Sequence, residues 1–407
     1  MAINRLFMAV VIAAGRSSRF KGATNKLLAT LCGRPLIYYP LRALSQSNMP
    51  VNVVTAVNAD FIRQTIRELH LPSEISFSIQ EHPRGTGDAV ASSFASWGEA
   101  EHILVVNGDM PLVQNHLIKQ LMDQHLEKGA TVSFVTSNVL NPFGYGRVVE
   151  GLSGVKIVEE KECDATQKQI SKVNAGIYIF KRTFLEQHVG LLSAQNATSE
   201  LYLTDLVGKA SSLGETVSMV YAPFDEVQGV NTVEEFWIVE QTMRSQLVRY
   251  WVEQGVYFEN PNNLHLDVDV QIGAHTKIGT GALLLRGSII GADCIISPFS
   301  ILGHAIVGNG TLIKSHTVVQ DSVIGNRCVV GPFVRIKNNT VVKDGARIES
   351  FVELSACTLG DCVVVHRLAC LENSVIDSHA VIANQVSSGS LDGITDYFGD
   401  EISQQRV

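Results

Sequence analysis

The chain has 407 residues, enough for two or three domains of ordinary size. Hydrophobic residues make up 45% of it and charged residues 18%, a composition that excludes a disordered or coiled-coil protein. The net charge of −8 argues against a protein that coats nucleic acid or an acidic membrane surface. A polyanionic substrate would therefore require positive charge concentrated at one place.

The seven cysteines are odd in number, and none is spaced as a CxxC pair. This usage predicts free thiols and a cytoplasmic protein rather than a disulfide framework or a zinc site. Near the start, Arg5 and the apolar run 6–14 imitate a secretory signal peptide. We expect a buried first strand instead, because the run leads directly into a Gly/Ser/Arg loop. No other stretch approaches the roughly 18 apolar residues that a membrane span needs.

The first 230 or so residues alternate short apolar runs with amphipathic stretches. The pattern predicts strands at 8–13, 53–57, 103–106, 131–135 and 177–180. It predicts helices between them, at 35–45, 61–69, 86–97 and 114–127. Such alternation gives a mostly parallel sheet with helices on both faces, and ligands bind at the carboxyl ends of its strands.

Residues 10–28 join the end of the first strand to a polar, basic loop. The strand ends at Ala13, the chain turns at Gly15, and Arg16, Arg19 and Lys26 follow. A triphosphate needs backbone N–H donors and cationic side chains that converge on it, and this segment offers both. A solvated surface loop is the alternative.

Two further segments follow predicted strands. Residues 105–112 place Asp109 at the end of an apolar strand, where an α/β enzyme holds a carboxylate for Mg²⁺. Residues 80–90 place Gly85 and Gly87 just before a helix, where the backbone can pass close to a base or a sugar. Taken singly, each segment is equally compatible with an ordinary turn.

The second half of the chain has a different period. Residues 232–254 read as a helical linking arm, and beyond it apolar residues recur every six positions, at 272, 278, 284, 290, 296 and 302. The register resumes one residue early at Val307 and continues to Ile382. A six-residue repeat sustained for more than 100 residues predicts a parallel β-helix. Consecutive hairpins, the alternative, would show a period of two.

The first half resembles the sugar-1-phosphate nucleotidyltransferases, most closely the uridyltransferase half of the bacterial bifunctional N-acetylglucosamine-1-phosphate uridyltransferase/glucosamine-1-phosphate acetyltransferase family. The likeness rests on ordered motifs: A-A-G-x-x-x-R-F with Asn25-Lys26-Leu27, G-T-G at 85–87, G-D-M-P-L at 108–112, G-Y-G-R at 144–147, I-V-E at 157–159, N-A-G-I at 174–177, E-L-Y-L-T-D at 200–205 and G-V-N at 229–231.

The resemblance implies a role for each matched residue. Ala13, Ala14 and Gly15 would bind the nucleotide, Arg19 the leaving pyrophosphate and Lys26 the phosphates. Base and ribose would be read by Gln80, Gly85 and Thr86, and Mg²⁺ would be held by Asp109 and Asn231. The sugar phosphate would be held by Gly146, Glu159, Asn174, Tyr202 and Thr204. The chain departs from the family at Ser17, Ser18, Pro83 and Arg84, so base and sugar identity stay open.

The second half resembles the acetyltransferase half of the same family, but its catalytic positions differ. Arg367 stands where the family has its histidine base, and Ser355 replaces a lysine, while Lys337 takes a phosphate-binding arginine position. The last coils of the family are replaced by a polar tail. We therefore expect a β-helix that packs and oligomerises, as a trimer, with Phe299, Phe333 and Phe351 as contact residues. An acyltransferase site using His304, His316 or His366 is the alternative.

The resulting prediction is a Rossmann-like α/β nucleotidyltransferase domain at 1–231, a helical arm at 232–262, a left-handed parallel β-helix at 263–385 and a polar tail at 386–407. We expect Mg²⁺-dependent transfer from UTP to N-acetylglucosamine 1-phosphate, with no nucleic-acid or membrane partner. Three alternatives remain: another NTP such as CTP or GTP or another sugar phosphate, a bifunctional enzyme that retains acyl transfer, and a non-catalytic scaffold.

Overall fold

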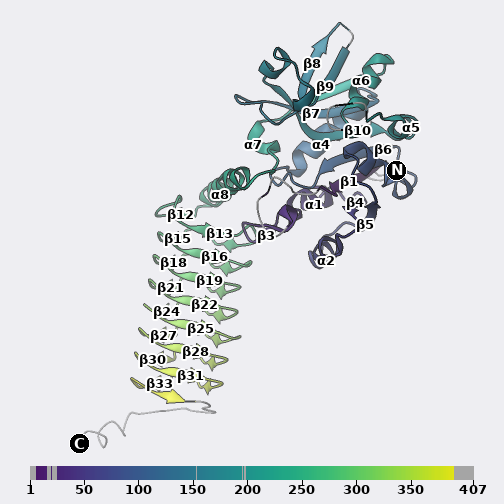
Figure 1. Cartoon of the computed structure of the whole chain (residues 1–407). Coiled ribbons are helices and arrows are strands. Elements are labelled where there is room, and N and C mark those ends of the chain that lie inside the picture. Colours follow the sequence, from purple (N-terminus) through teal and green to yellow (C-terminus); the bar gives the residue numbers. More distant parts are fainter. Residues whose placement is uncertain are drawn as a thin grey trace, which may run out of the picture. The chain divides into compact units, whose positions relative to one another are not determined.

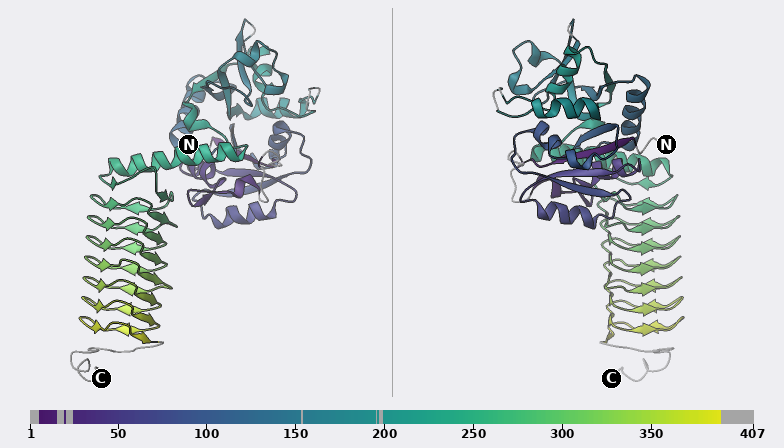
Figure 2. Two further views of the ribbon diagram at one scale, coloured as in Figure 1. Left: turned by 60° about the vertical axis from the view of Figure 1, so that its left-hand side comes forward. Right: turned by 90° about the vertical axis from the view of Figure 1, so that its right-hand side faces the viewer.

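The computed structural model describes residues 6–15, 20, 25–152, 154–194, 196 and 199–388. The chain forms two compact units, drawn in Figures 1 and 2. The first comprises the residues up to Leu31 and Pro35–Val239, and the second comprises Cys32–Arg34 with the chain from Glu240 onward. The division falls within helix α8 (Val233–Glu253), which occupies most of the predicted arm.

The first unit is built on a nine-stranded sheet, so the predicted α/β class is confirmed. Its main path is β11 (Val217–Tyr221), β7 (Val132–Asn138), β10 (Lys172–Lys181), β6 (His102–Asn107), β1 (Phe7–Ala13), β4 (Val51–Ala56) and β5 (Ile75–Gln80). All neighbours on this path are parallel except β10, which runs antiparallel to β6 and β7. The hairpin of β8 (Arg147–Gly151) and β9 (Gly154–Val158) pairs with β10. The apolar run that imitates a signal peptide is therefore the buried strand β1, between β4 and β6.

Helices cover both faces of this sheet. On one face α3 (Thr86–Ala91), α5 (Arg182–His188) and α6 (Asp205–Ser212) contribute to a core with Val10, Ile103 and Phe134. Helices α1 (Tyr38–Ser45) and α4 (Asn115–Glu127) pack together, and α2 (Asp60–Glu68) and α7 (Phe224–Val227) complete the unit. Within the part of the chain that the structure describes, none of the helices combines the length and apolar character that crossing a bilayer requires.

The second unit is the predicted left-handed parallel β-helix. Short strands from β12 (Tyr257–Phe258) to β34 (Ser387–Ser388) form three parallel sheets, each strand pairing with the one a coil further on. Figure 2 shows the coils stacked as successive rungs. The early resumption at Val307 is confirmed, because Ile289 pairs with Ile306, 17 residues away, whereas Lys277 pairs with Ile295, 18 residues away.

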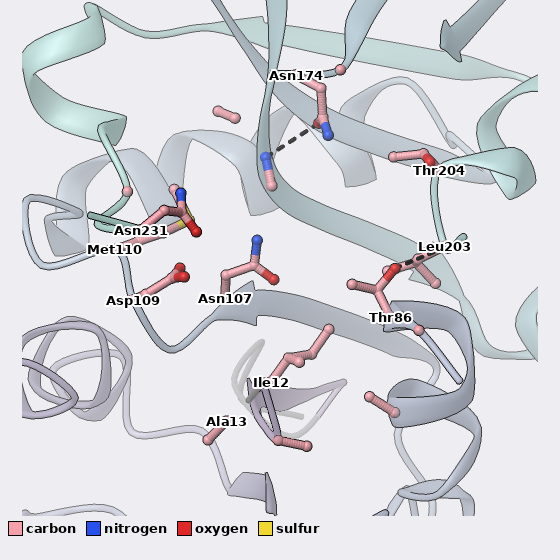
Figure 3. Close-up of a pocket in the computed structure, with 18 of the residues that line it drawn as sticks. Ile12, Ala13, Thr86, Asn107, Asp109, Met110, Asn174, Leu203, Thr204 and Asn231 are labelled. Atoms are coloured by element: carbon pink, nitrogen blue, oxygen red, sulfur yellow. Dashed lines mark hydrogen bonds between the residues drawn. The ribbon is translucent and has the colours of Figure 1, made fainter. Parts of the chain in front are cut away.

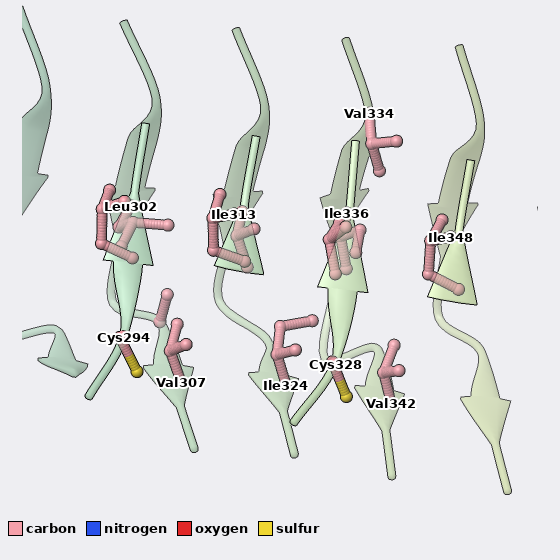
Figure 4. Packing of buried hydrophobic residues seen from close by; sticks show 14 of the residues in the cluster. Cys294, Leu302, Val307, Ile313, Ile324, Cys328, Val334, Ile336, Val342 and Ile348 are labelled. Carbon is pink, nitrogen blue, oxygen red and sulfur yellow. The ribbon is translucent and has the colours of Figure 1, made fainter. Parts of the chain in front are cut away.

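The core of the β-helix is a column of aliphatic side chains. Each two-residue strand turns its second residue inward, as Ile296, Ile313 and Val330 do in one sheet. Figure 4 shows this stacking, with the thiols of Cys294 and Cys328 among the aliphatic groups. None of the seven cysteines, all of which lie in the described part of the chain, forms a disulfide bond.

Candidate active site

A cavity of about 640 Å³ opens in the first unit where β1 and β6 end. This volume lies within the usual range for a site that binds a small molecule. β1 contributes Ile12 and Ala13, and β6 contributes Asn107, after which the chain turns at Gly108 toward Asp109. A side chain at Gly108 would place its Cβ 2.7 Å from Ile37 Cδ1 and 3.0 Å from Ile12 O, so a larger residue would crowd this turn.

Most of the residues expected at the site line this one cavity, although they come from distant parts of the chain. Those on its wall are Ala13, Ala14, Gly15, Lys26, Gln80, Gly85, Thr86, Asp109, Gly146, Glu159, Asn174, Thr204 and Asn231. Arg19 and the serines at 17 and 18 lie outside the described residues. Tyr202 is described but does not line the cavity, whereas its neighbours Leu203 and Thr204 do.

One side of the cavity carries a lysine surrounded by oxygen atoms. Lys26 Nζ lies 2.5 Å from Asp109 Oδ2, 2.8 Å from Val230 O and 3.3 Å from Asn231 Oδ1. The segments that carry Asp109 and Val230 are held together, because Val230 N donates a hydrogen bond to Asp109 O over 2.9 Å. Figure 3 shows Asp109 and Asn231 side by side at this end of the cavity.

The position of Asn231 follows from the start of helix α8. Glu235 Oε2 accepts hydrogen bonds from the backbone N–H groups of Asn231 (2.6 Å) and Thr232 (3.0 Å), and Thr232 Oγ1 accepts one from Glu235 N (3.1 Å). This reciprocal arrangement is a capping box, which fixes the direction in which a chain enters its helix. The capping box therefore holds Asn231 beside Asp109.

Asp109 and Asn231 suit a magnesium ion in kind and number. They supply one carboxylate and one amide oxygen that approach the same ammonium nitrogen, and Mg²⁺ prefers oxygen ligands. No group of three or more His, Cys, Asp or Glu side chains able to hold a metal occurs among the described residues. Mg²⁺ commonly binds through one or two protein groups together with substrate phosphates and water, and this pair fits that pattern.

The opposite part of the cavity is polar and partly acidic. Glu159 Oε1 accepts a hydrogen bond from Thr204 Oγ1 over 2.7 Å, and burial of the carboxyl group raises its pKa despite that bond. Asn174 is held from two sides: its Nδ2 donates to Tyr178 Oη over 2.5 Å, and its Oδ1 accepts from Gly176 N over 3.2 Å. Burial also raises the pKa of the Tyr178 hydroxyl, so this group stays protonated. These fixed groups can bind the hydroxyl groups of a sugar.

The Gly-Thr-Gly segment has a structural role that the sequence did not reveal. Gly85 has φ +119°, and a Cβ there would lie 2.6 Å from Leu201 O. Three hydrogen bonds also join it to the segment 201–203: Leu201 N donates to Arg84 O (2.6 Å), Gly87 N donates to Leu201 O (2.8 Å) and Leu203 N donates to Thr86 Oγ1 (3.0 Å). These glycines therefore allow the backbone of residues 85–87 to pack closely against the backbone at Leu201.

Asn107 was not among the expected site residues, yet it projects into the middle of the cavity, between Asp109 and Thr86 (Figure 3). Among the described residues its side-chain amide has no hydrogen-bond partner, which leaves both its donors and its acceptor for a ligand. A polar residue at the end of an otherwise apolar strand, two positions before Asp109, was the available signal.

Comparison with known proteins gives two domain matches. Residues 9–158 match the MobA-like NTP transferase domain, and residues 266–359 match the GMPPB C-terminal domain. The first range contains the ends of β1 and β6 with Lys26, Gln80 and Asp109. The second lies within the β-helix.

Whole-length relatives carry the name bifunctional protein GlmU. The protein of Clostridium kluyveri is 31% identical over 375 residues, covering 91% of this chain and 81% of the relative. That of Nitratiruptor sp. is 30% identical, covering 96% and 85%, and that of Halalkalibacterium halodurans is 32% identical, covering 86% and 77%. With this identity along both units, the chain belongs to the GlmU family of sugar-1-phosphate nucleotidyltransferases.

Proposed function

We propose that the enzyme transfers the uridylyl group of UTP to N-acetylglucosamine 1-phosphate, with Mg²⁺, giving UDP-N-acetylglucosamine and pyrophosphate. One observation carries this proposal: a single cavity holds a lysine with two oxygen ligands at one end and fixed sugar-binding groups at the other. A sugar phosphate and a nucleotide bound at these two ends would meet at their phosphates. The family membership supports the same reaction.

The reaction is an in-line displacement at phosphorus. An oxygen of the sugar phosphate forms a bond to the α-phosphorus of UTP, the bond from that phosphorus to the bridging oxygen breaks, and pyrophosphate leaves with the electron pair. No covalent enzyme intermediate is needed, so the protein contributes position and charge. Lys26 places its ammonium group beside the phosphates, and Arg19 is assigned to the leaving pyrophosphate. Mg²⁺, held by Asp109 and Asn231, would neutralise phosphate charge when bound.

The charge at the site supports the metal assignment. The cavity wall carries the acids Asp109, Glu159 and Glu200, and among the described lining residues Lys26 is the only lysine or arginine. Two phosphorylated substrates entering such a site bring several further negative charges. A divalent cation would offset these charges together with Lys26 and the assigned Arg19.

For the sugar, we assign Gly146, Glu159, Asn174 and Thr204 to its hydroxyl and acyl groups, with Tyr202 acting from outside the cavity wall. For the nucleotide, we assign Ala13, Ala14 and Gly15 to the phosphate and ribose side, and Gln80, Gly85 and Thr86 to the base. A pyrophosphate-release screen of four NTPs against glucose, glucosamine and N-acetylglucosamine 1-phosphates tests the assignment. UTP with N-acetylglucosamine 1-phosphate is expected to give the highest kcat/KM, and another winning pair would replace it.

We infer that the β-helix mainly joins copies of the chain, as a trimer. Most of the outward-facing strand positions of one sheet are apolar, and Ile289, Ile306 and Val375 among them are between 41% and 47% exposed. On one corner Phe299, His316, Phe333 and Phe351 stack with ring centroids 5.0 to 5.2 Å apart. Light scattering is expected to give three times the chain mass of 44.3 kDa. A monomer at micromolar concentration would contradict this.

Two of the side chains on the β-helix that could serve acyl transfer are each paired with a neighbouring carboxylate. Lys337 Nζ lies 2.6 Å from Glu353 Oε1, and His366 Nδ1 lies 3.1 Å from Glu349 Oε2. Arg367, at the position of the family's base, is exposed and always cationic, so it cannot accept a proton. We expect no steady release of CoA from acetyl-CoA and glucosamine 1-phosphate. We place the enzyme in the cytoplasm, where thiols that form no disulfide are stable.

A further inference from the structure

A buried carboxylate lies directly behind the Gly-Thr-Gly segment, on the first turn of α3. The side chain of Asp88 is 8% exposed and that of Arg84, one turn earlier, is 63% exposed. Arg84 donates to Asp88 Oδ1 from Nε over 3.0 Å and from Nη2 over 2.5 Å. The other oxygen, Oδ2, accepts a hydrogen bond from Gln80 Nε2 over 2.7 Å. Asp88 thus links an arginine outside the cavity to a residue on its wall.

These contacts fix the orientation of the Gln80 amide. Besides Asp88 Oδ2, Gln80 Nε2 donates to Gly85 O over 3.1 Å, so both of its hydrogens are used. Both partners are acceptors only. Turning the amide over would set Gln80 Oε1 against a carboxylate and a carbonyl oxygen, which is repulsive and leaves buried groups unpaired.

The acceptor of Gln80 is what remains for a ligand. Gln80 is 5% exposed and lines the cavity, and among the described residues its Oε1 has no hydrogen-bond partner. The site therefore presents an oxygen acceptor at this position and withholds the amide donor. A freely turning glutamine would offer either group and would discriminate poorly between bases.

We propose that Asp88, held by Arg84, is a positioning residue that fixes the Gln80 amide so that the site accepts a hydrogen bond from the imide N–H of a keto pyrimidine. Uracil carries such a donor at N3. Cytosine has no hydrogen on N3, so the lone pair of that nitrogen would face the lone pairs of Gln80 Oε1, and the two acceptors would repel each other. This inference rests on the proposed function, and it supplies the base selectivity that the residues at 80–90 left open.

The test replaces Asp88 by Asn, which offers an amide donor where the carboxylate accepts and so lets Gln80 turn over. The kcat/KM ratio of UTP to CTP in pyrophosphate release is expected to fall at least about tenfold, the scale of one hydrogen bond in a buried site. The change should appear as a higher KM for UTP with kcat nearly unchanged, because Asp88 touches no reacting atom. Asp60→Asn is the matched control, since Asp60 is exposed and ion-paired with Arg63.

A second variant keeps the test decisive if Asp88→Asn does not fold. Arg84→Met removes the guanidinium from a largely exposed position, and the UTP:CTP ratio is expected to fall in the same direction by a smaller factor. A ratio within twofold of the wild type in the variants that fold overturns the proposal. So does a wild-type enzyme that prefers CTP.

Calorimetric titration with UTP and CTP, without a sugar phosphate, distinguishes a failure of the proposed function from a failure of the positioning role of Asp88. If the wild type turns over no NTP but binds UTP more tightly than CTP, and Asp88→Asn removes that difference, the proposed function fails while the positioning role stands. If the wild type releases pyrophosphate and the binding difference survives in Asp88→Asn, the proposed function stands and the positioning role fails.

Discussion

Lys26 Nζ and Asp109 Oδ2 lie 2.5 Å apart, with side-chain exposures of only 11% and 21%. The lysine comes from the segment after β1 and the aspartate from just after the end of β6, so the pair joins two segments that follow neighbouring strands. The same ammonium group also reaches Asn231. The ammonium group of Lys26 thus contacts both of the residues assigned to Mg²⁺.

In this arrangement Lys26 would compete with Mg²⁺ for the same two oxygen atoms. Before substrates enter, the ammonium group of Lys26 neutralises Asp109 and keeps the partly buried carboxylate paired. Were Asp109 and Asn231 to hold Mg²⁺, the ammonium group of Lys26 would have to leave them, and substrate phosphates would offer it new partners. Lys26 would then exchange a protein carboxylate for a substrate anion without leaving the site.

The first prediction concerns Asp109. Asp109→Asn keeps the size of the side chain and removes the charge of the assigned metal ligand. We expect turnover to fall at least about a hundredfold, the scale seen when one key electrostatic group is removed. Pyrophosphate release at several Mg²⁺ concentrations measures it. Arg367→Ala, on the β-helix, and the exposed Asp60→Asn should leave the rate almost unchanged; near-normal release by Asp109→Asn would show that the metal assignment is wrong.

The second prediction separates Lys26 from the metal. In Lys26→Met the ammonium group no longer competes for Asp109 and Asn231, so Mn²⁺ should bind the nucleotide-free protein more tightly, as electron paramagnetic resonance can measure. Turnover should fall by about a hundredfold or more, because a cation beside the phosphates is lost. Lys209→Met, an exposed lysine on α6, is the matched control. Weaker Mn²⁺ binding in Lys26→Met would contradict the competition.

The third prediction concerns a buried pair of histidines, His102 at the start of β6 and His125 on α4. His125 Nδ1 lies 2.7 Å from Ser133 Oγ, and its Nε2 lies 3.0 Å from His102 Nδ1. Burial lowers the pKa of His125 to about 3 and also lowers the pKa of His102. Below pH 6.5 the unfolded chain therefore binds protons that the folded protein does not, so stability is complete above pH 6.5 and is lost as the pH falls.

Each of these groups should cost on the order of 1 kcal/mol of unfolding free energy per pH unit below 6.5, down to its folded-state pKa. Urea unfolding at pH 7.0 and 5.0 measures the loss. His125→Gln should flatten the dependence, whereas His70→Asn, at an exposed histidine with φ +50°, should leave it as in the wild type. An unchanged slope in His125→Gln would mean that this pair does not control acid stability.

The fold was largely predictable because its two halves carry different and strong periods. In the β-helix even the point at which the repeat shortens by one residue, at Val307, was predicted correctly. The pattern is strong because the apolar residue of each repeat must point inward. Edge strands β5 and β11 were missed, because their half-exposed faces give short mixed patterns rather than apolar runs. The helix expected at 86–97 ends at Ala91, where the hydroxyls of Ser92 and Ser93 bond back to Asp88 O and Val90 O.

The site residues that could be predicted are those that lie at or just after the end of a strand. Ala13, Gly15 and Asp109 could be placed from the residues alone, whereas Glu159 and Thr204 entered only through the family resemblance. Asn107 and Asp88 were missed, for different reasons. Asn107 lies between the strand expected at 103–106 and Asp109, and no role was expected for it. The role of Asp88 depends on three side chains whose distances no linear pattern encodes.

The last prediction joins binding and stability at Glu159. Burial raises the pKa of this carboxyl group above its ordinary 4.5, and the hydrogen bond from Thr204 only partly opposes this. Between 4.5 and the raised pKa, the folded protein keeps a proton that the unfolded chain releases. Stability from this group is therefore present below pH 4.5 and is lost as the pH rises through the raised pKa.

Glu159→Gln keeps the shape and the acceptor for Thr204 but removes the titration. The melting temperature of the variant should equal or exceed that of the wild type at pH 7 to 8, and the difference should vanish near pH 4. The KM for the sugar phosphate should rise about tenfold, because a charged acceptor for a sugar hydroxyl becomes a neutral one. Glu186→Gln, on the exposed part of α5, is the matched control for both measurements. A variant that is less stable at neutral pH and binds the sugar phosphate normally would remove Glu159 from the sugar site.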